Sequence, residues 1–322
     1  MLGWFNLNLK KTGNVAAVKE MPFNTLPYDQ LKVFAIGKRD AEVISTEEYC
    51  KRKSNELRTI LLDTKSFNAD QKRNELRNIL RINEKSVLKN VHEYPPLSGW
   101  NRVALETSNE KLIPVSIHTS SLNSKKFVIE NISAALIEKL IKSGSGIAII
   151  DLSGTGKTAS ASLHSYDSVG KLRTLSKSYL LLGKTAMGEW VKEITVVIGF
   201  IKAKYKSYEI SINGTKETGL AGLFLSALEG NIKNVTLQDS PVSYLFDNRE
   251  SIEYFSTCVN LPGFLNWGDI SLAAALAAKN ITFINPLTMS GRMISGEQFK
   301  AYKAEVEQTR IRHHKGGKTI YQ

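Results

Sequence analysis

Apolar residues recur at helical spacing over residues 45–82, the first strongly patterned part of the chain. Ser45-Thr-Glu-Glu48 has the spacing of a capping box, with a glutamate three residues after the serine. The pattern predicts one helix from there to about residue 62 and a second over residues 68–82. The two contain nearly the same heptapeptide, Asn55-Glu-Leu-Arg-Thr-Ile-Leu61 and Asn74-Glu-Leu-Arg-Asn-Ile-Leu80. Two copies are too few for a solenoid, so we interpret them as a helical pair that packs on a larger domain.

Beyond this pair the chain is interrupted and the pattern changes. Tyr94-Pro-Pro96 and Ser98-Gly99 form a break. We therefore predict an N-terminal extension over residues 1–97 and a main domain over residues 98–322.

In the main domain, strand patterns alternate with helix patterns. Residues 102–106 and 112–118 alternate like a β-hairpin, and residues 146–151 are a continuous apolar run, as in a strand buried on both faces. The further predicted strands are 127–130, 208–212, 234–238 and 281–285, and the predicted helices are 132–143, 188–202, 219–228, 270–278 and 297–309. This order predicts an α/β domain with a mostly parallel sheet covered by helices on both faces. Ligands of such sheets bind beyond the C-terminal ends of the strands, so chemistry is sought there.

Composition narrows the classes of function. With 42% hydrophobic and 23% charged residues, the composition is typical of a soluble globular protein. No apolar run approaches the ~20 residues that a membrane-spanning helix needs. Residues 1–6 show no signal-peptide pattern, and the sequence does not indicate the cellular compartment of the protein. The net charge of +12 is spread along the chain without interleaved aromatic residues, which argues against nucleic-acid binding. Cys50 and Cys258 lie far apart and outside any CxxC pattern, so neither a disulfide nor a metal or cofactor site is expected.

The first strand end of interest is Asp151-Leu-Ser-Gly-Thr-Gly-Lys-Thr158. Gly-Lys-Thr after a buried strand suggests a phosphate-binding loop, with Asp239 as a partner on a later strand. That motif requires a glycine five positions before Gly156, where this chain has Asp151. The simpler interpretation is a tight turn that leads the chain away from the sheet.

The second strand end is Asn213-Gly-Thr-Lys-Glu-Thr-Gly219, followed by a helix of small residues. A strand, a glycine-flanked turn and such a helix describe a nucleophile elbow. Counting forward from Gly214 puts Lys216 at the apex, and counting back from Gly219 puts Glu217 there. Neither is an activated hydroxyl or thiol nucleophile.

The third strand end, residues 281–291, lies where a catalytic acid would follow a late strand. It contains no Asp or Glu; Asn285 and Thr288, the latter at the acid position, cannot stabilise an imidazolium as a carboxylate does. His313 and His314 come late enough in the chain for a triad, but the sequence favours the simpler interpretation that they are two exposed residues of a basic tail.

Four segments in order resemble one family. They are Asp151-Leu-Ser-Gly-Thr-Gly, Asn213-Gly-Thr-Lys-Glu-Thr-Gly-Leu-Ala-Gly, Leu237-Gln-Asp-Ser-Pro-Val-Ser-Tyr244 and Leu261-Pro-Gly-Phe-Leu-Asn-Trp-Gly-Asp269. Together they resemble α/β-hydrolases of the acetylxylan esterase and prolyl-oligopeptidase-like group. The resemblance implies that fold and, in active members, Ser-Asp-His removal of acyl groups from carbohydrates. The chain departs from the family at the serine, at the acid, and at Ser153, where the family has an arginine. Some members look like tandem hydrolases, in which a working domain is followed by a degenerate one. Residues 2–10 resemble the linker after a first hydrolase domain, so the resemblance implies an adjacent hydrolase domain as a partner.

Three functions follow from these patterns. The first is a non-catalytic hydrolase-like domain that serves as a structural, carbohydrate-binding or partner-binding module. The second is an esterase with a displaced triad, with Ser240 or Ser243 as nucleophile; the candidate acids and bases are Asp239, Asp269, His164 and His313. The third is a nucleotide-binding protein that uses Lys157, Thr158 and Asp239. The sequence favours the first and does not indicate an oligomeric state.

Overall fold

The structure is a computed structural model. It describes the chain except for residues 14–15, 17, 20–21, 35–39, 41, 65–67, 120–125, 132–133, 160–167, 208, 246–253, 278–279 and 313–316. The chain divides into two compact units, Met1–Glu48 and Tyr49–Gln322. The first unit contains helix α1 (Leu2–Asn8), a 3-10 helix (Tyr28–Gln30) and the start of helix α2 (Thr46–Asp63). None of the helices within the described residues has the length and apolarity needed to cross a membrane.

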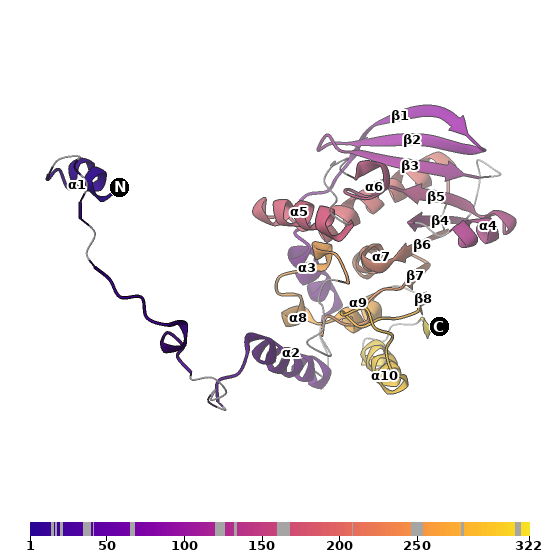
Figure 1. The fold of residues 1–322 in the computed structure, drawn as a ribbon. Helices are drawn as coiled ribbons and strands as arrows, with labels where there is room; N and C mark the ends of the chain where they lie inside the picture. Colours follow the sequence, from indigo (N-terminus) through magenta and orange to yellow (C-terminus); the bar gives the residue numbers. More distant parts are fainter. Residues whose placement is uncertain are drawn as a thin grey trace. The chain divides into compact units, whose positions relative to one another are not determined.

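A nine-stranded sheet forms the centre of the second unit (Figure 1). Its strands are β1 (Leu88–Leu97), β2 (Trp100–Thr107), β3 (Leu112–His118), β4 (Lys126–Asn131), β5 (Gly146–Ile150), β6 (Glu209–Thr215), β7 (Asn234–Gln238), β8 (Asn280–Ile284) and β9 (Thr319–Tyr321). They lie in the order β1-β2-β3-β5-β4-β6-β7-β8-β9. The pairs β1–β2, β2–β3 and β3–β5 are antiparallel, and every pair from β5 to β9 is parallel.

Helix α3 (Ala69–Ile79) precedes every strand of the sheet. The helices that connect the parallel strands are α4 (Ala134–Lys142), α5 (Ser168–Leu181), α6 (Ala186–Tyr205), α7 (Lys216–Glu229), α8 (Phe264–Trp267), α9 (Ile270–Leu276) and α10 (Gly296–Arg312). The chain moves along the sheet in one direction from β4 to β5 and in the other from β5 to β6. Because such crossovers are right-handed, α4 lies on the opposite face from α5 and α6. This reversal beside β4 and β6 puts the switch point of the sheet next to the end of β6, where ligands of such folds bind.

The helix boundaries follow local sequence signals. Asn68 caps α3, its Oδ1 accepting from the backbone N–H groups of Asp70 (2.9 Å) and Gln71 (3.1 Å). Thr185 caps α6 in the same way by accepting from Gly188 (3.0 Å). Gly230 ends α7 in the left-handed conformation that glycine adopts without strain.

Helix α3 is built into the core of the second unit. Leu76 and Leu80 are fully buried within the main hydrophobic cluster. The Thr185 hydroxyl donates to the Leu80 carbonyl at 2.8 Å, and a Cβ on Gly188 would lie 1.9 Å from that carbonyl oxygen. The backbones of α3 and α6 therefore meet in direct contact.

The sheet begins earlier than the predicted domain boundary at residue 97. Leu88–Leu97, which we expected in the extension, is strand β1, at the edge of the sheet. The pairing of β1 with β2 has a register shift between Tyr94 and Leu97, so Pro95 and Pro96 lie at an irregularity of an edge strand, where proline is tolerated. The two prolines therefore interrupt the pattern without ending a domain.

The alternation of strands and helices is confirmed: each strand and helix predicted between residues 45 and 309 has a counterpart. Among the described strands and α-helices, the pattern missed α1, β1, α5, α8 and β9. Strand β1 is mostly exposed on both faces, so it lacks the alternation that marks a half-buried strand.

We expect the two cysteines to differ strongly in reactivity. Cys50 is exposed, whereas Cys258 is buried and its burial raises the pKa of the thiol to about 12. At pH 8 the thiolate fraction of Cys258 is then on the order of one in ten thousand. Maleimide labelling of the native protein should modify one thiol per chain and labelling in guanidinium two. Rapid modification of both thiols in the native state would contradict the buried position of Cys258.

Candidate active site

The turn from β6 to α7 has the backbone of a nucleophile elbow, and Lys216 is its apex. Lys216 has φ of +50°, an uncommon and strained conformation for a side-chain-bearing residue, and α7 starts at this residue. Of the two counts left open by the sequence, the one that starts at Gly214 therefore matches the backbone. Glu217 is the next residue, inside the helix and buried.

Two features of the sequence hold this turn. A Cβ on Gly214 would lie 2.5 Å from the backbone nitrogen of Gly219, so strand and helix approach more closely than a larger residue would allow. Thr215 and Thr218 form a capping box, in which the Thr218 hydroxyl lies 3.1 Å from the Thr215 nitrogen.

A tyrosine lies between the elbow and the next strand ends. The Lys216 ammonium lies 4.6 Å from the centre of the Tyr254 ring. The same ring packs on Gly291, where a Cβ would come within 2.2 Å of it. Tyr254 thus fills space between the apex and the loop after β8, where a substrate of an elbow nucleophile would need room.

The turn after β8 carries no carboxylate between Ile281 and Ser295. Asn285 has φ of +48° and its N–H donates to the Gln322 carbonyl at 2.8 Å. The Thr288 hydroxyl is 2.9 Å from that of Ser290 and accepts from the Arg292 N–H at 3.3 Å. The polar groups of this turn are used to hold the turn itself.

Solved structures of esterases share this arrangement of strands and helices. A candidate acetyl xylan esterase from Bacteroides fragilis superimposes with a TM-score of 0.62 at 12% identity, over 88% of this chain and 84% of that one. A methylesterase superimposes with a TM-score of 0.55 at 16% identity, over 86% of this chain and 64% of that one. The chain has the α/β-hydrolase fold. This identification rests on structure, because no family model and no curated protein sequence matches the chain.

Ser240, the first alternative nucleophile, is a buried link between two strand ends of the hydrolase fold. It is 0% exposed, and its Oγ lies 2.7 Å from the Lys216 carbonyl oxygen and 3.2 Å from that of Gln238. The neighbouring Asp239 has φ of +50°, and its N–H donates to Ile284. Both residues stabilise the edge of the sheet that carries the elbow.

Ser243 and Asp269 do form a hydrogen-bonded pair, but a guanidinium lies beside it. The Ser243 hydroxyl donates to Asp269, whose carboxylate also accepts from the N–H groups of Tyr244 (2.9 Å) and Ile270 (2.8 Å). Arg58 of α2 lies 3.7 Å from Asp269 and forms a close ion pair with Glu305. Asp269 thus caps α9 and lies beside a partly buried cation whose close ion pair is with Glu305.

The charges of this buried group shift one another's ionisation. Burial lowers the pKa of the Arg58 guanidinium, but the carboxylates of Glu305 and Asp269 raise it by more, so Arg58 stays charged. Burial also raises the pKa of the Asp269 carboxyl, against the hydrogen bonds that it accepts.

The loop after β5 does not have the form of a phosphate-binding loop. The Thr158 hydroxyl lies 2.6 Å from the Leu152 carbonyl oxygen, and Lys157 points outward, exposed, from a 3-10 helix. Strands β4 and β6 lie between β5 and β7, so at ~4.8 Å per strand this loop and Asp239 are about 14 Å apart. This separation gives no support to a shared nucleotide site.

Ser153 in the same loop is hydrogen-bonded to Glu193 of α6. The Ser153 N–H donates to Glu193 at 2.9 Å, and Lys111 reaches the same carboxylate at 3.4 Å. Burial raises the pKa of Glu193, while Lys111 and Ser153 oppose the rise. Lys111, in the turn between β2 and β3, thus places a cation beside the carboxylate that Ser153 binds.

The structure places two of the five histidines, and both lie on the antiparallel strands. His92 of β1 lies 2.9 Å from Glu106, and His118 of β3 packs beside Trp100. His164, His313 and His314 lie outside the described residues. Within the described part of the chain no group of three His, Cys, Asp or Glu residues could hold a metal ion.

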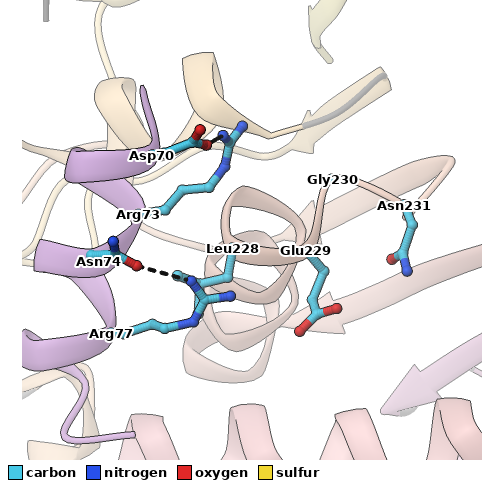
Figure 2. Close-up of a pocket in the computed structure, with 8 residues that line it drawn as sticks. All are labelled: Asp70, Arg73, Asn74, Arg77, Leu228, Glu229, Gly230 and Asn231. Carbon is cyan, nitrogen blue, oxygen red and sulfur yellow. Dashed lines mark hydrogen bonds and ion pairs between the residues drawn. The ribbon is translucent and has the colours of Figure 1, made fainter. Parts of the chain in front are cut away.

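Two hollows differ sharply in size. Beneath the elbow, a space of about 10 Å³ is lined by residues such as Ile212, Asn213 and Thr218, which is barely room for one water. A pocket of about 530 Å³ lies elsewhere, between α3 and the end of α7 (Figure 2). No pattern in the sequence indicates this pocket or the position of Tyr254, because both depend on how distant segments meet.

Proposed function

We propose that this chain is a non-catalytic α/β-hydrolase-fold domain that acts as a binding module. The observation that supports the proposal is the conformation of Lys216, which has φ of +50° at the start of α7 and its ammonium against the Tyr254 ring, so that a lysine stands where an elbow would need its nucleophile. An ammonium cannot serve as the acyl-accepting hydroxyl or thiolate of this mechanism. The turn around Thr288 supports the same proposal, since residues 281–295 contain no carboxylate that could serve as the acid of a triad.

Carbohydrate is the ligand class that we propose for the module. One structural neighbour is named as an acetyl xylan esterase, and the step from that neighbour to this chain is an analogy between folds. An adjacent hydrolase domain is the alternative partner that the sequence suggested.

Ester hydrolysis tests the loss of catalysis. We expect the purified chain to turn over p-nitrophenyl acetate and acetylated xylo-oligosaccharides at the rate of buffer alone. Lys216→Ala should leave that rate unchanged. Multiple-turnover kinetics are needed, because a lysine can be acetylated once without catalysis.

The esterase with a displaced triad makes the opposite prediction. It is favoured by the Ser243–Asp269 hydrogen bond and opposed by Arg58, which lies against that pair. Turnover well above background that Ser240→Ala or Ser243→Ala abolishes, and that the exposed control Ser178→Ala does not, would establish this esterase and refute our proposal.

A further inference from the structure

The pocket between α3 and α7 lies at the opposite end of α7 from the elbow. It is lined by Asp70, Arg73, Asn74, Arg77, Leu228, Glu229, Gly230 and Asn231. Helix α7 has 14 residues, so at 1.5 Å per residue the pocket lies about 20 Å from Lys216. Its volume of about 530 Å³ is in the range of small-molecule sites.

The walls of the pocket are fixed by Arg73. Its Nε donates to the Ala227 carbonyl at 2.9 Å, at the C-terminal end of α7, and its Nη1 donates to Asp70 at 2.8 Å. A third hydrogen bond, to Leu276 at 3.4 Å, ties α3 to the end of α9. A guanidinium at two helix C-termini is favourably placed in their dipoles. A ligand would therefore meet a site that is already formed.

Arg77 differs from its counterpart in the repeated heptapeptide. Arg58, at the same position of the first copy, is surrounded by Glu305, Asp269 and the Tyr302 ring. Arg77 has one hydrogen bond in the described chain, to the Asn74 amide oxygen at 3.4 Å. Figure 2 shows its side chain reaching from α3 toward Leu228 and Glu229. Its donors are left available to a ligand.

The charges of the lining select against ions. Asp70 and Arg73 neutralise each other, which leaves Arg77 and Glu229 with opposite charges on one pocket. An anion drawn to Arg77 would meet Glu229 and the negative end of the α7 dipole, and a cation would meet Arg77. Asn74 and Asn231 each offer both donors and an acceptor, which matches hydroxyl groups that both donate and accept.

We propose that this pocket binds a neutral saccharide. The proposal rests on the binding role proposed above and names its site, with Arg77 donating to and Glu229 accepting from vicinal hydroxyls while Leu228 contacts the C–H face of the sugar ring. Because the pocket is open to water, binding should be weak.

Isothermal titration and saturation-transfer NMR test the proposal, with xylotetraose and maltotetraose as neutral probes and glucuronate as the acidic probe. We expect at least one neutral probe to bind with a Kd of about 1 mM. Arg77→Met and Glu229→Gln should each weaken binding about tenfold. Asn78→Ala, an exposed position on α3 outside the lining, should leave it unchanged, with thermal unfolding verifying that each variant folds.

Three results would overturn the assignment: no binding of either neutral probe up to about 20 mM, a range that covers weak sites, unchanged affinity in both Arg77→Met and Glu229→Gln, or tighter binding of glucuronate. The ester assay on the same samples separates this failure from failure of the proposed function. An inactive chain that binds no saccharide loses the pocket assignment and carbohydrate as its ligand class, whereas the loss of catalysis stands.

Discussion

Replacing Arg58 by methionine is expected to lower the free energy of unfolding by about 3 kcal/mol. Methionine keeps the apolar stem but removes the guanidinium that lies between Glu305 and Asp269, whose side chains are only 5% and 3% exposed. Two carboxylates would then be buried without a cation, and α2 would lose its main polar contact with α9 and α10. Urea unfolding followed by circular dichroism measures the change.

The matched control for Arg58 is the equivalent residue of the second heptapeptide. Arg77→Met should lower the free energy of unfolding by less than about 1 kcal/mol, because Arg77 has no described carboxylate partner.

Acidic pH offers a second control for Arg58→Met. Burial already raises the pKa of Asp269, and removal of Arg58 should raise it further, so the carboxyl becomes neutral as pH falls. The difference in the free energy of unfolding between the parent and Arg58→Met should therefore become smaller at acidic pH. Equal losses in the two variants at neutral pH would contradict the buried ion cluster.

Gly214→Ala should destabilise the domain by about 3 kcal/mol, since its added methyl group meets backbone rather than a movable side chain. The new Cβ would lie 2.5 Å from the nitrogen and 2.6 Å from the Cα of Gly219. Strand β6 and helix α7 would have to separate at the elbow. Differential scanning calorimetry measures the loss.

At Gly199, in the middle of α6, substitution by alanine is expected to raise the free energy of unfolding rather than lower it. A Cβ there meets nothing within 4 Å and the position is exposed, so Gly199→Ala should stabilise the domain by about 0.5–1 kcal/mol. A Gly214→Ala variant as stable as the parent would show that the close approach of strand and helix at the elbow is not present in solution.

The order of elements could be predicted from the sequence because the parallel strands are short apolar runs separated by helices with caps. The elbow could be located for a similar reason: Gly214 and Gly219 mark a close backbone approach. What the pattern could not decide was its apex, since the counts from the two glycines disagree by one residue. Only the backbone conformation of Lys216 resolves them.

The contents of the site depend on contacts between distant segments. Tyr254 reaches the elbow from a loop 38 positions beyond Lys216, and Arg58 reaches Asp269 from the other end of the chain. Tyr254 belongs to no local motif, and the repeated heptapeptide that contains Arg58 does not indicate its partner. The serines that looked suited to catalysis, Ser240 and Ser243, are instead hydrogen-bonded in the interior.

The contact between α3 and α6 limits how this domain can be moved between proteins. The Leu80 carbonyl lies so close to Gly188 that the C-terminal end of α3 and the N-terminal end of α6 are in direct backbone contact. A graft or fusion that starts at the first strand of the sheet would leave behind Leu76 and Leu80, two fully buried leucines. The smallest transferable portion of the second unit therefore begins before Asn68, upstream of every strand.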